Sequence, residues 1–234
     1  MPSWLTVIIP TRNEAANLPG CLASCEPLGD VEVVIADCGS TDGTVEIALQ
    51  SGCRIITAPA GRALQMNAAA FEATGDVLLF LHADCRLPAN AERAMRQTLS
   101  QPGVDWGAFP HRIDGNRLAY RVIEWSDNVR ARRLRSPYGD QAIFVRRELF
   151  HEIGGYPEVP LLEEVLLAKQ LRRRASFGFV EATLLTDARR WERRGVVRTT
   201  LTNWCIRLLA AVGLPLPRLA RLYYGASRAD FTGD

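Results

Sequence analysis

The feature of the sequence that most constrains its fold is an alternation of short apolar runs with helical stretches over the first hundred residues. The apolar, β-branched runs are residues 5–9, 31–36, 54–57 and 77–81, and the stretches with helical spacing of apolar residues are 13–24, 45–51 and 62–74. Strands that are apolar on both faces and alternate with helices predict a parallel sheet of βαβ units. We therefore expect an α/β fold with a mostly parallel central sheet flanked by helices, and a ligand outside the carboxyl ends of the strands.

The second half of the chain breaks this alternation. Helices are expected there over residues 89–100, 118–134, 165–174 and 198–224, the last of them broken near 213–215. A strand or turn is expected over residues 106–111. The sequence contains no internal repeat and no low-complexity linker. It predicts a single domain over residues 1–234.

The charge balance excludes a dedicated nucleic-acid binder. Lys and Arg number 28 against 26 Asp and Glu, a formal net charge of +2. The halves differ, with 8 arginines against 13 acidic residues over 1–117 and an excess of basic residues over 118–234. The six cysteines form no CxxC pair, and the sequence has no signal peptide and no apolar run of spanning length. These features predict a cytoplasmic protein with reduced thiols and no transmembrane segment.

Polar residues follow three of the four predicted strands. They are Thr11, Arg12, Asn13 and Glu14 after the first strand, Asp37 after the second, and His82, Ala83 and Asp84 after the fourth. One carboxylate from each strand end would lie at the same rim of the sheet. There Asp84 would bind a divalent cation together with a diphosphate. The alternative for Asp37 and for nearby Asp42 is a turn or helix-capping role, and for Asp84 a plain turn.

Several strings together resemble a known family. Residues 7–14 (VIIPTRNE), 37–44 (DCGSTDGT) and 80–84 (FLHAD) look like the nucleotide-sugar half of a GT-A fold glycosyltransferase of the inverting family 2. Residues 138–141 (YGDQ), 154–157 (GGYP) and 162–164 (LEE) are similar to the acceptor half. The His-Ala-Asp variant and residues 188–191 (ARRW) resemble, more narrowly, a bacterial subgroup associated with arsenosugar biosynthesis. The resemblance covers roughly residues 5–195.

The resemblance implies a donor site in the first half of the chain. Residues 10–14 (Pro10, Thr11, Arg12, Asn13 and Glu14) and Asp37 would hold the nucleotide base and ribose. Arg62, with Gln65 and Asn67 on the same helix, would lie near the base or phosphates, although a solvated arginine at a helix start is the alternative. Asp84 would be the carboxylate that binds Mn²⁺ or Mg²⁺, and His82, beside Ala83, stands where the family commonly has its first metal-motif acid.

The resemblance also implies a catalytic set in the second half. Glu164 matches the catalytic base, with one methylene more than the family's Asp, and Glu163 is its neighbour. The alternative for both is that of helix N-terminal acids that favour the helix dipole. Asp140 would orient the acceptor or a base. Arg189, Arg190 and Trp191 would close over the diphosphate and the acceptor.

These observations predict a metal-dependent inverting glycosyltransferase that moves a sugar from a nucleoside diphosphate sugar, a UDP-sugar in the first instance, to an unidentified hydroxyl acceptor. Residues 1–100 would form the donor and metal half, 101–197 the acceptor half and 198–234 a helical tail. The tail would either pack on the domain or form a homodimer, or contact the inner face of a membrane. The alternatives are a non-catalytic nucleotide-sugar binder or scaffold and a nucleotidyltransferase, although the N-terminal loop lacks the lysine that the latter needs. A dinucleotide-dependent oxidoreductase is disfavoured because no GxGxxG motif follows the first strand.

Overall fold

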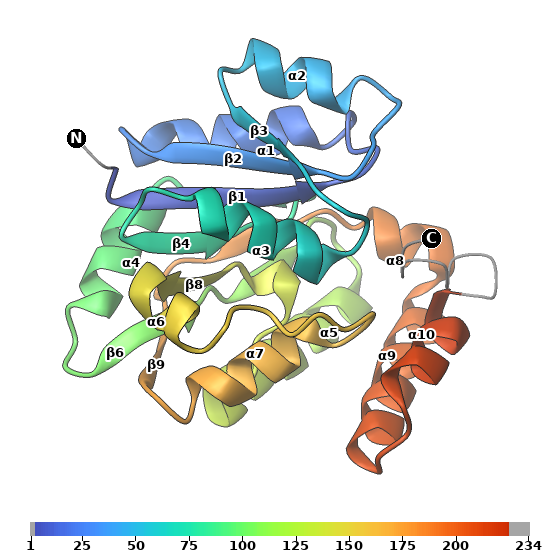
Figure 1. Ribbon diagram of the computed structural model, residues 1–234. Helices are drawn as coiled ribbons and strands as arrows, with labels where there is room; N and C mark the ends of the chain where they lie inside the picture. The colour runs from blue at the N-terminus through green and yellow to red at the C-terminus, as the bar shows by residue number, and fades with distance from the viewer. Residues whose placement is uncertain (1–2, 225–234) are drawn as a thin grey trace.

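The computed structural model describes residues 3–224, apart from the side chains of residues 190, 193, 194 and 197. Its centre is a seven-stranded sheet with the order β3-β2-β1-β4-β8-β6-β9 (Figure 1). The strands are β1 (Leu5–Thr11), β2 (Glu32–Asp37), β3 (Arg54–Thr57), β4 (Val77–Phe80), β6 (Val104–Ala108), β8 (Ile143–Arg146) and β9 (Ser176–Phe179). Strands β3, β2, β1 and β4 pair in parallel, whereas β8 runs antiparallel to both β4 and β6. The predicted mostly parallel sheet is confirmed.

Helices cover both faces of this sheet, which explains why its first strands are apolar throughout. Along β1, Val7 and Ile9 pack into the core under α1 (Leu18–Cys25), α2 (Thr44–Gln50) and α4 (Ala91–Leu99), whereas Ile8 points to the opposite core. That second core lies under α3 (Arg62–Glu72), α6 (Arg147–Glu152) and α7 (Glu163–Leu171). The alternation of neighbouring side chains across a buried strand therefore holds the sheet between two helical layers.

A second, three-stranded sheet and a long helix complete the second half of the chain. The sheet has the order β5-β10-β7, formed by β5 (Cys85–Arg86), β10 (Leu184–Thr186) and β7 (His111–Ile113). Helix α5 (Leu118–Leu134) packs beside β7 and has the bounds that the sequence predicted. Two short 3₁₀ helices, η1 (Glu26–Leu28) and η2 (Gly139–Gln141), lie in the loops.

The helix expected over residues 13–24 begins later than predicted. Asn13 has a φ of 57°, a left-handed conformation that a helix cannot contain, and the chain turns until α1 begins at Leu18 with Pro19 in its first turn. Strands β8, β9 and β10 and helix α6 were not predicted. The three strands are short, and they owe their burial to pairing with segments far away in the sequence.

The C-terminal segment forms three helices, α8 (Arg189–Arg194), α9 (Val196–Ala211) and α10 (Leu216–Tyr224), which lie to one side of the main sheet (Figure 1). The predicted break near residues 213–215 separates α9 from α10. A small apolar cluster of Leu161, Ile206, Leu219 and Ala220 joins the two helices to the loop before α7. Within the described part of the chain, no helix has the length and the apolar character needed to cross a membrane.

Candidate active site

A pocket of about 120 Å³ lies at the carboxyl end of β4, between the main sheet and the helices α5, α9 and α10. Segments that are distant in the sequence contribute its walls, because the parallel strands end at one rim and residues from the second half of the chain complete the lining. Six of the residues singled out from the sequence line the pocket: Arg62, His82, Asp84, Asp140, Glu164 and Trp191.

His82 and Glu164 approach each other across Gly139. A Cβ atom at Gly139 would lie too close to both His82 Nε2 and Glu164 Oε1, so that only glycine fits between the two side chains. The Nε2 atom of His82 is buried and has no hydrogen-bond partner among the described residues. The pocket therefore offers an unpartnered imidazole nitrogen beside a carboxylate, an arrangement that suits a polar or charged guest.

Glu163 and Glu164, adjacent at the start of α7, have different environments. Leu162 precedes them in a left-handed conformation, with a φ of 65°. Glu163 is only 2% exposed, and its Oε1 lies 2.7 Å from Nε of Arg62. Glu164 faces the pocket, and its Oε1 lies 3.9 Å from Nη1 of Arg62. Of the two candidate bases, Glu164 is the one that a pocket-bound acceptor could reach.

The charges of Arg62, Glu163 and Glu164 affect one another's pKa values. Burial and the neighbouring Glu164 raise the pKa of Glu163 to about 7, although the guanidinium of Arg62 opposes this shift. Burial alone would lower the pKa of Arg62, but the two carboxylates raise it well above its ordinary value. Arg62 therefore stays charged in the lining of the pocket, where it is paired with Glu163 although 37% of its side chain is exposed.

Asp84 and His82 are the candidate metal ligands. Both line the pocket, and the backbone carbonyl of Asp84 accepts a hydrogen bond of 2.9 Å from the backbone N–H of Asp187 after β10. No cluster of three or more His, Cys, Asp or Glu side chains among the residues described could hold a metal ion without further ligands. Asp84 supplies the anionic oxygen that a hard divalent cation prefers, and the unpartnered Nε2 of His82 is a second donor among the residues of the same pocket.

Asp37 organises the loop that follows β2. Its carboxylate accepts hydrogen bonds from Thr11 Oγ1, from Ser40 Oγ and from the backbone N–H groups of Gly39 and Ser40, at 2.5–2.9 Å. Burial would raise the pKa of Asp37, but these bonds hold it below its ordinary value. The turn role, which the sequence left open, is therefore present here, whatever Asp37 also does for a nucleotide.

The loops after β1 and β2 are joined to each other in the same way. Asn13 accepts a hydrogen bond at Oδ1 from the N–H of Thr41 and donates its own N–H to Ser40 Oγ. Asp42 accepts from the backbone N–H groups of Ala15 and Thr44. Asp42 thus has the turn role that the sequence left open, whereas the N-cap of α2 is Gly43, and hydrogen bonds join the two loops to each other.

Gln65 and Asn67 are engaged by the backbone and do not line the pocket. Gln65 Nε2 donates to the carbonyls of Thr11 and Ala36, at 2.9 and 2.7 Å, and the side chain is buried. Asn67 exchanges two hydrogen bonds of 2.9 Å with the backbone of Tyr156. In this structure both residues position loops, and the direct donor contacts expected of them are not part of the site described here.

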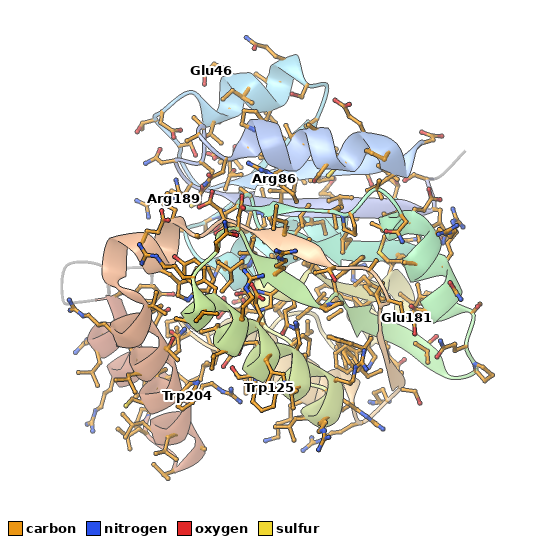
Figure 2. All side chains as sticks on the ribbon, turned by 180° about the vertical axis from the view of Figure 1, so that it is seen from behind. Glu46, Arg86, Trp125, Glu181, Arg189 and Trp204 are labelled. Atoms are coloured by element: carbon orange, nitrogen blue, oxygen red, sulfur yellow. The ribbon has the colours of Figure 1, made fainter. Side chains whose placement is uncertain are left out.

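Arg189 connects the C-terminal helices to the first loop. Its Nη2 lies 3.2 Å from Oε2 of Glu14, and Figure 2 labels Arg189 on α8. Trp191 is buried and packs near Tyr120, with ring centroids 6.4 Å apart. The prediction for Arg190 concerns a side chain outside the described residues. At the end of β1 and in the loop that follows it, Pro10 is half-buried, Thr11 is buried and Arg12 is exposed. Ala83, in the loop after β4, is buried.

Sequence reasoning missed a buried histidine behind the pocket. His111 Nε2 lies 3.6 Å from Oδ2 of Asp127, and its Nδ1 lies 3.8 Å from Oδ2 of Asp140. Burial alone would lower the pKa of His111, but the two carboxylates raise it above its ordinary value. Asp127 and Asp140 both line the pocket. No sequence motif indicates that His111, Asp127 and Asp140 lie together, because a single acidic residue such as Asp127 does not stand out in an arginine-rich helix.

The sequence also gave no indication that α9 and α10 help to form the pocket. Trp204, Arg207 and Tyr223 line it from these helices. Arg207 lies over the ring of Tyr138, 5.3 Å from its centroid, and Tyr138 is itself a pocket residue. The predicted tail is therefore part of the candidate site.

The sheet order and the loops at its carboxyl rim define the GT-A fold, the class to which nucleotide-sugar transferases belong. Residues 1–349 of S. aureus TarS, solved in complex with UDP-GlcNAc, align with a TM-score of 0.62 and 18% identity over 78% of this chain and 58% of that chain. Glucosyl-3-phosphoglycerate synthase from Mycobacterium tuberculosis, solved with Mn²⁺, UDP and glucosyl-3-phosphoglycerate, aligns with a TM-score of 0.60 and 21% identity over 90% and 80% of the two chains. At these identities the likeness establishes the fold.

The chain belongs to glycosyl transferase family 2, whose family description matches residues 6–156. A PGL/p-HBAD biosynthesis glycosyltransferase of Mycobacterium bovis is 38% identical over 169 residues, 64% of this chain and 62% of that protein. Glycosyltransferase AglE of Haloferax volcanii is 26% identical over 177 residues, 66% of this chain and 56% of that protein. The chain thus spans about three fifths of the length of these relatives.

Proposed function

We propose that this chain is a metal-dependent, inverting glycosyltransferase that moves a sugar from a UDP-sugar to a hydroxyl acceptor. The observation that carries the proposal is the meeting of Glu164, Asp84 and Arg62 at one pocket, from three separate segments of the chain. Family membership supports the reaction class, and the UDP and UDP-GlcNAc bound to proteins of the same fold support the donor class.

Glu164 is the proposed general base. Its carboxylate takes the proton of the acceptor hydroxyl while that oxygen bonds to the anomeric carbon of the donor. The bond from this carbon to the diphosphate breaks at the same time, and its electron pair leaves with the diphosphate. Attack from the face opposite the leaving group inverts the configuration. Glu163, bound to Arg62 and excluded from the pocket, positions that arginine instead.

Positive charge at the rim would stabilise the departing diphosphate. Arg62 supplies it from the lining of the pocket, and Arg189 from α8, where its partner Glu14 is only partly buried and can be exchanged for phosphate oxygens. We assign Arg190 to the same task from its position in the sequence. Trp191 would close the acceptor side.

Asp84 and His82 would hold Mn²⁺ or Mg²⁺ together with the diphosphate. The ion, when bound, neutralises charge on the leaving group. The Mn²⁺ in the M. tuberculosis synthase structure supports this assignment. The joined loops after β1 and β2, with residues 10–14 and Asp37, would form the base and ribose site, because their backbone is already ordered by Asp37 and Asn13.

The remaining parts of the proposal concern organisation. Residues 1–100 act as the donor and metal half, 101–197 as the acceptor half and 198–234 as a helical tail, in a cytoplasmic enzyme. A placement within the arsenosugar-associated subgroup is proposed from the His-Ala-Asp string and residues 188–191 alone. The acceptor half contributes Asp140, which would orient the acceptor hydroxyl towards Glu164.

The test is release of UDP from a panel of UDP-sugars, with and without Mn²⁺ and acceptor alcohols. Glu164→Gln is expected to lower turnover at least 100-fold and to change UDP affinity less than threefold, because the carboxylate acts on the acceptor. Glu181→Gln, an exposed glutamate far from the pocket (Figure 2), is the matched control and should match the wild type. Binding of UDP-sugars without any turnover, unchanged by Glu164→Gln, would instead favour the non-catalytic nucleotide-sugar binder.

A further inference from the structure

Helix α5 exposes an apolar stripe on its outer face. Leu118, Val122 and Trp125 follow one another at spacings of four and three residues, so they share one side of the helix. Trp125 is 68% exposed. Large apolar side chains that are exposed singly are ordinary, but a stripe of them that ends in a tryptophan indicates a contact surface.

Helix α9 exposes a second stripe of the same kind. Leu201, Trp204 and Leu208 of α9, and Val212 directly after its end, follow at spacings of three, four and four residues, and Trp204 is 57% exposed. Helices α5 and α9 are in contact, and Figure 2 shows Trp125 and Trp204 on these neighbouring helices at the same face of the molecule. We call the seven residues of the two stripes the α5–α9 face: Leu118, Val122, Trp125, Leu201, Trp204, Leu208 and Val212.

The exposed charges on α9 and α10 are positive. The sequences of α9 and α10 contain no Asp or Glu, whereas they contain four arginines, of which Arg198, Arg218 and Arg221 are exposed. Exposed arginines also follow at the end of α5, at positions 132, 133 and 135. A second copy of the chain in a symmetric dimer would bring like charges together, because the same patch faces itself. An anionic surface complements the charge.

We propose that the α5–α9 face docks on an anionic lipid bilayer. The leucine, valine and tryptophan side chains insert at the level of the headgroups, and the flanking arginines bind lipid phosphates. Trp204 belongs both to this face and to the pocket wall, so the pocket lies next to the docked surface. Resting on the proposed function, this placement makes the acceptor an amphiphilic alcohol whose hydroxyl reaches Glu164 from the bilayer.

The test is co-sedimentation of the full chain with vesicles of phosphatidylcholine alone and with 30% phosphatidylglycerol. The wild type is expected to bind the anionic vesicles at least tenfold more strongly than the neutral ones, and to lose this preference in 0.5 M salt. The variant Trp125→Gln/Leu208→Ser/Val212→Ser is expected to bind the anionic vesicles at least tenfold more weakly. None of its three substitutions lies in the pocket lining.

The matched control is Leu49→Ser/Phe71→Gln, which removes exposed apolar side chains from α2 and α3, and it should bind as the wild type does. Equal binding by the wild type and the face variant, or no binding by the wild type, would overturn the proposal. So would a wild-type dimer that the face variant makes monomeric in light scattering. UDP release from a water-soluble donor should be the same in the wild type and the face variant, so failure of membrane binding is separable from failure of the proposed enzyme activity.

Discussion

The guanidinium of Arg62 makes its short contact, 2.7 Å from Nε to Oε1, with the buried Glu163. The pocket-facing Glu164 is left at 3.9 Å from the same group. One of two adjacent carboxylates is thus engaged in holding a positive charge, and the other remains available for chemistry. The fold, and not the residue type, gives the two carboxylates different environments.

Glu163 should make the stability of the protein depend on pH. Its pKa is raised from 4.5 to about 7 by burial and by Glu164, against the effect of Arg62, so the folded state binds more protons than the unfolded state between these values. The contribution to the free energy of unfolding is therefore fully present below pH 4.5 and is lost as the pH rises to about 7. We expect a change on the order of 1 kcal/mol or more, since one pKa unit corresponds to about 1.4 kcal/mol.

Urea denaturation of the wild type and of Glu163→Gln, from pH 4.5 to 8, measures this effect. The difference between the two proteins should change with pH across the interval and be constant above it. A difference that does not vary with pH would contradict the raised pKa. Glu46→Gln, at an exposed site on α2 (Figure 2), serves as the control.

Gly139 should be essential for activity because of its position between two side chains. In Gly139→Ala, the new Cβ meets His82 and Glu164, and both must move. Overpacking of this kind costs on the order of 1–3 kcal/mol of stability, while a displacement of about 1 Å at a catalytic group can cost about 100-fold in rate. Turnover should fall at least tenfold at a temperature where circular dichroism shows the variant folded. Gly213→Ala, at the turn between α9 and α10 where a Cβ meets nothing, should retain turnover despite its own positive φ of 91°.

The sequence predicted the helices and strands whose own residues form a clear pattern, and it missed those that depend on pairing with distant segments. Residues of β1 and β4 are buried on both faces, so their apolar runs were unmistakable, and α5 ended as its pattern indicated. Strand β8 was missed because its burial comes from pairing with β4, where Val145 lies opposite Leu78, far away in the sequence. Short strands of this kind are recognisable only once their partners are known.

The same distinction applies to the site residues. Asp37 and Asp84 both follow a buried strand, but only the folded loops show that the Asp37 carboxylate already accepts four hydrogen bonds, whereas Asp84 lines the pocket. The sequence favoured Glu164 over its neighbour Glu163 as the base, but only the structure shows that Glu163 makes the short contact with Arg62 while Glu164 lines the pocket. His111 was assigned no role because its partners come from two other segments.

His111 should add a second pH dependence at higher pH. Burial lowers its pKa, but Asp140 and Asp127 outweigh this and raise it above the ordinary value of 6.5. A raised folded-state pKa means that the contribution to stability is fully present below about pH 6.5 and is lost as the pH rises through the folded-state pKa. The difference in unfolding free energy between the wild type and His111→Gln should therefore shrink as the pH increases from 6.5 to 9. A difference that grows over this range would contradict the assignment. His151→Gln, on an exposed position of α6, is the matched control.

The Glu14–Arg189 pair should contribute little to stability and more to donor binding. The two side chains are 27% and 33% exposed, and pairs of this kind are typically worth less than about 1 kcal/mol. A double-mutant cycle with Glu14→Gln and Arg189→Gln should give a small coupling energy that decreases with salt. Arg189→Gln should nevertheless weaken UDP binding several-fold by calorimetry, whereas Arg86→Gln, at an exposed arginine on β5, should not. Unchanged UDP affinity in Arg189→Gln would remove this arginine from the phosphate site.

The metal assignment predicts unequal effects for its two residues. Asp84→Asn should abolish the increase in UDP affinity that Mn²⁺ produces, because a hard divalent cation depends on an anionic oxygen ligand. His82→Asn should reduce that increase by a smaller factor, since imidazole is the weaker ligand for such an ion. Affinity for UDP in EDTA should be similar in all three proteins, which separates loss of the ion from damage to the nucleotide site. Calorimetric titration of UDP with and without Mn²⁺ measures both, and an undiminished effect of Mn²⁺ in Asp84→Asn would refute the assignment.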